Sequence, residues 1–117
     1  MSFETTANKG FRMSFSNGFS ISIQWGTENY CNNRSLSSGL EPMEDRFWDS
    51  KDAEIAVFNR QGRMIEIASH DYVIGYASSD FVASAISLVS NAKNEKELIS
   101  DIKKSNEKKS LIDSLDS

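Results

Sequence analysis

Residues 10–26 read GFRMSFSNGFSISIQWG, and they decide how the chain begins to fold. Apolar and polar side chains alternate on both sides of the Asn17-Gly18 pair, and alternation with a period of two is typical of a strand with one buried face. The stretch therefore predicts two antiparallel strands joined by a tight turn. The side chains predicted to share the buried face are Phe11, Met13, Phe15, Phe19, Ile21, Ile23 and Trp25.

The length of the connecting loop decides which residues of this hairpin face each other. A two-residue loop at Asn17-Gly18 would place apolar side chains opposite polar ones. A three-residue loop that begins at Ser16 pairs Phe15 with Phe19 and keeps the apolar side chains on one face. Because the buried face sets the register, we predict the three-residue loop, with Gly18 in the left-handed conformation of a bulged turn.

A second hairpin is predicted around Arg60-Gln61-Gly62 by the same reasoning. EIAVFN at residues 54–59 and RMIEIA at residues 63–68 are its two arms, and they place Val57 opposite Ile65. Gly62 takes the left-handed position of this turn.

A fifth strand, YVIGY, is predicted at residues 72–76, with Gly75 as a bulge or a point of close approach. Ser78, Ser79 and Asp80 then supply N-cap chemistry for a helix that runs to about residue 91. One helix packed on one face of an antiparallel sheet of four to five strands (two hairpins plus one strand) is an α+β fold. The apolar residues that recur at helical spacing are Phe81, Val82, Ala85, Ile86, Leu88 and Val89.

The C-terminal stretch, residues 93–117, holds six lysines and six acidic residues. Its apolar residues form two groups, and residues 103–110 between them include none. We therefore expect residues 1–92 to form a single α+β domain and residues 93–117 to be a charged extension, helical or partly disordered, that docks weakly. The alternative is that this extension pairs with a partner chain and makes the protein a homo-oligomer.

Composition excludes several classes of function. The chain of 117 residues is 38% hydrophobic and 26% charged, as in ordinary globular domains, and no apolar run is long enough to span a membrane. A net charge of -4 argues against general nucleic-acid binding. A single cysteine fits a reducing cytoplasm, and one cysteine with one histidine argues against a metal site. No motif indicates a cofactor.

The segment WGTENYCNNR at residues 25–34 is the candidate binding site. Aromatic rings stack on planar groups, amides read polar edges, and an arginine can take a phosphate or an acidic partner group. The alternative is structural: Trp25, Tyr30 and Cys31 would fill the sheet edge while the asparagines form local turns. The residues predicted to contact a partner or ligand are Trp25, Asn29, Tyr30, Asn32, Asn33 and Arg34.

Two further groups of residues carry a weaker chemical signal. Cys31, His70 and Asp71 contain the elements of a nucleophile, a base and an orienting carboxylate, but we expect a buried structural cysteine and a turn histidine. The acidic stretch at residues 41–54 lacks the ligand spacing of a calcium loop and is interpreted as a solvated loop. We therefore expect no catalytic and no metal-binding residues.

The stretch GFRMSFSNGFSISIQWGTENYCNNR resembles a family of small proteins of unknown function encoded by bacteriophages and by bacteria that carry prophages. The shared pattern is F-x-M-x-F, an N-G turn, S-x-Q-[WF]-G and an N-Y-C loop, and similarity continues through DAEIAVFNRQGRMI and the G-Y-x-S-x-D helix start. It covers about residues 10–90. The matching positions are Phe11, Met13, Phe15, Asn17, Gly18, Ser22, Gln24, Trp25, Gly26, Asn29, Tyr30 and Cys31.

That family has no established activity, so the resemblance implies origin more than mechanism. It implies a small cytoplasmic accessory protein that acts by binding: it would inhibit a host protein, such as a defence component, or sequester a small anionic, nucleotide-like ligand. The alternatives are a small enzyme that uses Cys31 and an assembly protein that oligomerises through its C-terminal extension. The charged extension and the polar loop at residues 27–39 depart from the family pattern.

Overall fold

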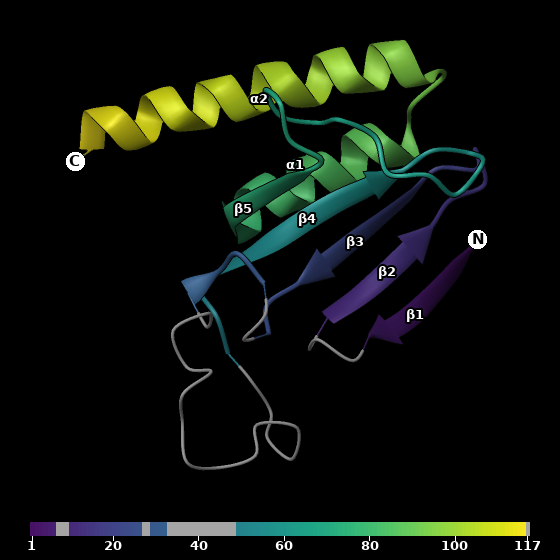
Figure 1. Ribbon diagram of the computed structural model, residues 1–117, viewed down its shortest axis with the longest axis horizontal. Coiled ribbons are helices and arrows are strands. Elements are labelled where there is room, and N and C mark those ends of the chain that lie inside the picture. Colours follow the sequence, from purple (N-terminus) through teal and green to yellow (C-terminus); the bar gives the residue numbers. More distant parts are fainter. Residues whose placement is uncertain (7–9, 27–28, 33–48, 117) are drawn as a thin grey trace.

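The computed structural model describes residues 1–6, 10–26, 29–32 and 49–116, with side chains through residue 109. It is an α+β fold, as predicted, with a five-stranded antiparallel sheet and two helices (Figure 1). The elements are β1 (Ser2–Thr6), β2 (Gly10–Ser14), β3 (Ser20–Gln24), β4 (Asp52–Phe58), β5 (Val73–Ser78), α1 (Ser79–Ser90) and α2 (Glu95–Asp116).

The first hairpin has the register that its buried face requires. Met13 pairs with Ile21 in the sheet, and the Phe15 N–H donates to the Phe19 carbonyl at 2.9 Å. Gly18 has a φ of 92°, which is the left-handed conformation predicted for the three-residue loop. Strand order in the sheet follows the chain from β1 to β5, so every strand lies beside its neighbours in sequence.

The second hairpin is confirmed at its turn and wrong in its returning arm. Gly62 has a φ of 78°, and the Ile65 N–H donates to the Val57 carbonyl at 2.9 Å. Beyond the bridge between Phe58 and Met64, however, residues 63–68 form no strand, because β5 takes the edge of β4 that this arm would need. The alternation of the arm has another cause: Ile65 and Ile67 both enter the core.

The sequence pattern did not predict strand β1. It pairs with β2 from Ser2 opposite Ser14 to Thr6 opposite Gly10, and its side chains are largely exposed. Phe3 is the single apolar residue of this segment, so the segment has no alternating pattern that would predict a strand. The sheet still has five strands because β1 replaces the arm that does not form.

Helix α1 covers part of one face of the sheet. The Ser78 hydroxyl accepts a hydrogen bond from the Phe81 N–H at 3.1 Å, which confirms the predicted N-cap. Phe81, Ala85 and Val89 are buried at intervals of four residues, and the helix packs on β3, β4 and β5. Figure 1 shows both helices near β4 and β5, with β1 at the far end of the sheet.

Helix α2 docks more tightly than the sequence indicated. Leu98 and Ile102 are 1% and 0% exposed and belong to the same core as the sheet residues. Lys103 also lies 3.7 Å from Glu66, across from the connection between β4 and β5. Both side chains, one helical turn apart, thus enter the core, which differs from the weak docking that the charge content suggested for this part of the extension.

Candidate functional site

The described part of the 25–34 segment is held against the sheet by two carboxylates. Glu54 accepts from the Tyr30 N–H at 2.9 Å, and Asp52 accepts from the Asn32 N–H at 2.6 Å. Both acids belong to the stretch that the sequence suggested was a solvated loop, so part of that stretch has a structural role at the start of β4. The other acidic residues of 41–48 lie outside the described residues.

Asn29 acts inside the fold, although we predicted that it would contact a ligand. It is 5% exposed, its Oδ1 accepts from the Gly26 N–H at 3.0 Å, and its Nδ2 donates to Glu54 at 3.3 Å. Both ends of its amide are therefore used to close the turn after β3. This agrees with the structural alternative for this residue.

Gly75 is a point of close approach, and the strand bulges beside it. The Tyr76 N–H donates to the Tyr30 carbonyl at 2.8 Å, and a Cβ at position 75 would lie 2.7 Å from the Tyr30 Cβ. The register between β4 and β5 shifts between Ala53 and Ile55, and Tyr76 has a φ of 54°. The bulge and the missing side chain together make room for the 29–32 segment.

We expect Gly75→Ala to detach this segment from β5. The added methyl group would overlap Tyr30, so either the segment or the strand must move, at a cost of about 1–3 kcal/mol. Thermal unfolding followed by circular dichroism measures the loss. Gly62→Ala adds a methyl group with nothing within 4 Å of it, but at a φ of 78°, so it measures a backbone strain that Gly75→Ala does not carry. The control for the contact is therefore Gly75→Ala in a Tyr30→Gly chain, which lacks the Tyr30 Cβ. Equal losses for Gly75→Ala in the two backgrounds would show that contact with the Tyr30 Cβ is not the cause.

Cys31 and His70 have the structural roles that we expected of them. Cys31 is 1% exposed, and its Sγ donates to the Gly26 carbonyl at 3.5 Å. His70 is exposed, in a turn closed by hydrogen bonds between Ala68 and Asp71, with a φ of 61°. A cysteine-dependent activity gains no support from a thiol in this position. Among the described residues, no cluster of histidine, cysteine or carboxylate side chains could hold a metal ion.

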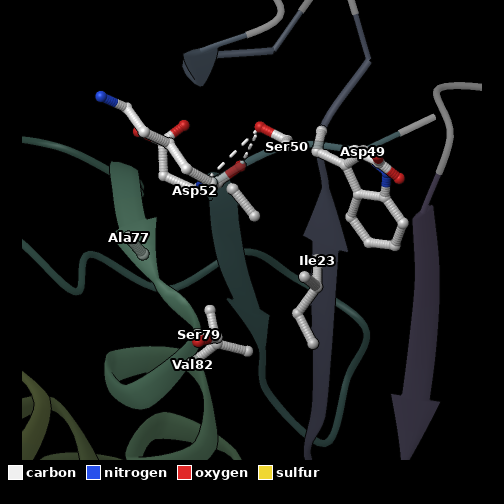
Figure 2. A pocket seen from close by; sticks show the side chains of 10 residues that line it. Ile23, Asp49, Ser50, Asp52, Ala77, Ser79 and Val82 are labelled. Atoms are coloured by element: carbon white, nitrogen blue, oxygen red, sulfur yellow. Dashed lines mark hydrogen bonds between the residues drawn. The ribbon is translucent and has the colours of Figure 1, made fainter.

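A groove opens where β3 ends, β4 begins and α1 starts (Figure 2). It has a volume of about 500 Å³. Ser50 is fixed at its rim, since its hydroxyl donates to the Asp52 carbonyl at 2.6 Å. Its apolar lining consists of Ile23, Trp25, Ala53, Ala77 and Val82, and its polar rim consists of Asp49, Ser50, Lys51, Asp52 and Ser79.

An apolar surface lies beside this groove, on the part of the sheet away from α1. We call it the β1–β2 apolar surface and define it by Phe3, Phe11 and Met13, which the strand register places on one face. Phe3 is 77% exposed. Phe11 meets the Trp25 ring edge-on, with centroids 6.3 Å apart, so Trp25 connects the surface to the groove.

The structure divides the predicted contact residues between two faces of the sheet. Trp25 shares the face of Ile23, where the helices lie, and lines the groove. Tyr30 packs against Gly75, next to Glu54. Gly75 and Glu54 each neighbour a core residue in their own strand, Ile74 and Ile55, so they lie on the opposite face of the sheet. Tyr30 and Asn32 have exposed side chains. Asn33 and Arg34 lie outside the described residues.

The sequence did not predict the groove or the β1–β2 apolar surface as a site. Alternation predicts which side chains share the apolar face of a strand, but it does not show whether another element covers that face. Fold and site together define a two-layer α+β protein with an apolar groove between β3, β4 and α1 and with an exposed edge strand, β1. Comparison of the chain with protein families, with curated proteins and with solved structures found no match. Of the helices in the described residues, none is long and apolar enough to cross a membrane.

Proposed function

We propose that the protein acts by binding another protein, and that the groove and the β1–β2 apolar surface form the contact region. The observation that supports this is the exposure of Phe3, which is 77% exposed beside Phe11 and Met13, and the continuity of these residues with the groove through Trp25. Exposed apolar surface that is continuous with a groove is typical of interaction sites.

The charges at the rim favour a protein partner over an anionic small molecule. Among the described residues of the lining, Asp49 and Asp52 outnumber the one basic residue, Lys51, so this part of the rim disfavours a phosphate group. An aromatic or aliphatic anchor beside a lysine or arginine suits both the apolar floor and the acidic rim. We therefore propose a partner segment that presents such a pair of side chains.

The sequence resemblance to small phage and prophage proteins leads us to propose a host protein, such as a defence component, as the partner. Binding at the groove would inhibit that protein by covering part of its surface. No step of this function requires a catalytic group from the chain.

Lysine substitutions at two adjacent positions of α1 test the proposal. Val82 is half-buried in the lining of the groove, whereas Ala83 is exposed on the same helix. Tagged wild-type and variant proteins are used to capture partners from host cells, and the affinity of a captured protein is then measured by calorimetry. We expect Val82→Lys to weaken that affinity by about 30-fold, as expected for a contact worth about 2 kcal/mol, and Ala83→Lys to leave it unchanged.

Circular dichroism melting of both variants verifies that they fold. A partner that Val82→Lys and Ala83→Lys bind equally well would place the contact region elsewhere. The Tyr30 side chain on the opposite face and the exposed Asn32 side chain would then be the next positions to test.

A further inference from the structure

Within the part of the chain that the structure describes, no strand pairs with the outer edge of β1, and this edge has a defined set of outward-facing main-chain groups. In the ladder between β2 and β3, Phe15 and Phe19 form a hydrogen-bonded pair. Such pairs alternate along antiparallel strands, so Arg12 directs its main-chain groups toward β1, where its partner is Glu4. It follows that the N–H and C=O groups of Phe3 and Thr5 point away from the sheet.

This edge lacks most of the usual protection against pairing with another chain. Natural edge strands are commonly blocked by charged side chains, above all lysine, by proline or by a bulge. SFETT contains neither lysine nor proline, and Glu4 is its one charged residue. Its register with β2 is continuous over all five residues. Its main apolar side chain, Phe3, is 77% exposed. The strand is therefore a ready template for strand addition.

We propose that β1 pairs antiparallel with β1 of a second copy, with the two-fold axis at Phe3. The outward main-chain groups allow an axis at Phe3, Glu4 or Thr5. An axis at Glu4 would set two carboxylates opposite each other, which is destabilising. An axis at Phe3 sets the two rings together, with Glu4 opposite Ser2 and Thr5 opposite Met1.

Self-complementarity of the strand is the reason for choosing a second copy as the occupant. Glu4, the one charged side chain of β1, is paired in register with Arg12, but the Arg12 guanidinium is turned toward β3 and β4, where it donates to Ser20 at 2.9 Å and lies 3.9 Å from the centre of the Phe58 ring. With the axis at Phe3, Glu4 would lie opposite Ser2 of the second copy, so no two carboxylates meet. Phe3 would gain cover from Phe3 of the second copy. The two-fold contact is isologous and closes on itself, so it produces a dimer without further growth through this edge.

Pairing of this kind joins two five-stranded sheets into one, with both β1–β2 apolar surfaces at its centre and on the same face. The helices of each copy would stand at the outer ends of this continuous surface. Pairing at the edge of β1 does not rest on the proposed function, because it uses main-chain groups of β1 and no residue of the groove lining. Phe3 is the side chain that both involve, and self-association is measured on the purified chain alone, so the two can fail separately.

Sedimentation equilibrium over a range of protein concentrations measures the assembly. We expect the wild-type chain to dimerise and Phe3→Lys to raise the dimer dissociation constant by about tenfold or more, because two ammonium groups would then meet at the axis. Glu4→Gln is the matched control on the same strand, and it should leave the dissociation constant unchanged.

Cysteine substitution tests the register itself. With oxidised glutathione as oxidant, Phe3→Cys should form a disulfide between copies, because directly opposed strand residues lie within disulfide reach. Thr5→Cys should not, because it would face Met1 of the second copy. The native Cys31 is 1% exposed and should not react. A monomer at all concentrations, a dimer that resists Phe3→Lys, or preferential linkage through Thr5→Cys would each overturn the proposal.

Discussion

A chain that ends before residue 95 is expected to lose cooperative unfolding. Its missing helix, α2, contributes Leu98 and Ile102, which are 1% and 0% exposed and belong to the main core. This expectation reverses the one drawn from charge content alone, which treated residues 93–117 as an extension the fold could lose. Burial of these two side chains decides between the two views.

The size of the effect follows from the two buried side chains. Truncation of a large aliphatic side chain in a core costs about 2–5 kcal/mol, and removal of both would cost about 4–10 kcal/mol. Total stability of a small domain is about 5–15 kcal/mol. The expected loss is therefore a large part of the total stability.

Circular dichroism and differential scanning calorimetry measure the outcome. A chain that ends after Lys109 is the control, because it keeps Leu98 and Ile102, and we expect it to melt cooperatively. Ile102→Ala should cost about 2–5 kcal/mol, while Lys104→Ala, at an exposed position, should cost less than about 0.5 kcal/mol. A cooperative transition in the chain ending before residue 95 would show that the core holds without α2.

Asn17→Asp is expected to destabilise the protein by about 3 kcal/mol. The Asn17 Nδ2 donates to the carbonyls of Val89 at 2.8 Å and Ala92 at 3.0 Å, so the turn of the first hairpin caps the C-terminus of α1. Its Oδ1 meanwhile accepts from the Phe19 N–H at 3.1 Å. An aspartate keeps the acceptor, loses the donors, and sets a negative charge against carbonyl oxygens at the negative end of the helix dipole.

Two variants separate these causes. Asn17→Ala removes the donors without adding charge and should cost about 1–2 kcal/mol, less than Asn17→Asp. Ser16→Asp adds the charge at the neighbouring exposed position of the turn and should cost less than about 0.5 kcal/mol. Urea unfolding curves give the three values. Equal losses for Asn17→Asp and Asn17→Ala would show that the carbonyls at the end of α1 do not repel the carboxylate.

Arg60 strengthens the same junction from the second turn. Its Nε donates to the Asn17 carbonyl at 2.8 Å, one of its terminal nitrogens donates to the Lys93 carbonyl at 3.0 Å, and its guanidinium lies 4.9 Å from the centre of the Phe19 ring. The first hairpin turn, the second turn and the connection between the helices therefore meet at one point. The sequence of neither turn predicts this contact between them.

Local features of this protein could be predicted from sequence because each one is decided within a few residues. The register of the first hairpin follows from alternation plus the turn at Gly18, and the start of α1 follows from the hydroxyl of Ser78. For the candidate site, the same pattern placed Trp25 correctly on an apolar face, and the Gly75 close approach was anticipated.

Tertiary structure alone decided which elements cover which. Strand β1 exists because β2 offers it an edge, the arm at residues 63–68 fails as a strand because β5 holds the edge of β4, and α2 docks through Leu98 and Ile102. Alternation and helical spacing predict that one face of a strand or helix is apolar. Which element packs against that face depends on contacts between segments that are distant in sequence. For that reason the sequence by itself determined the register of the first hairpin and the turns, and only the assembled fold left Phe3 exposed on the face of the sheet that carries the groove.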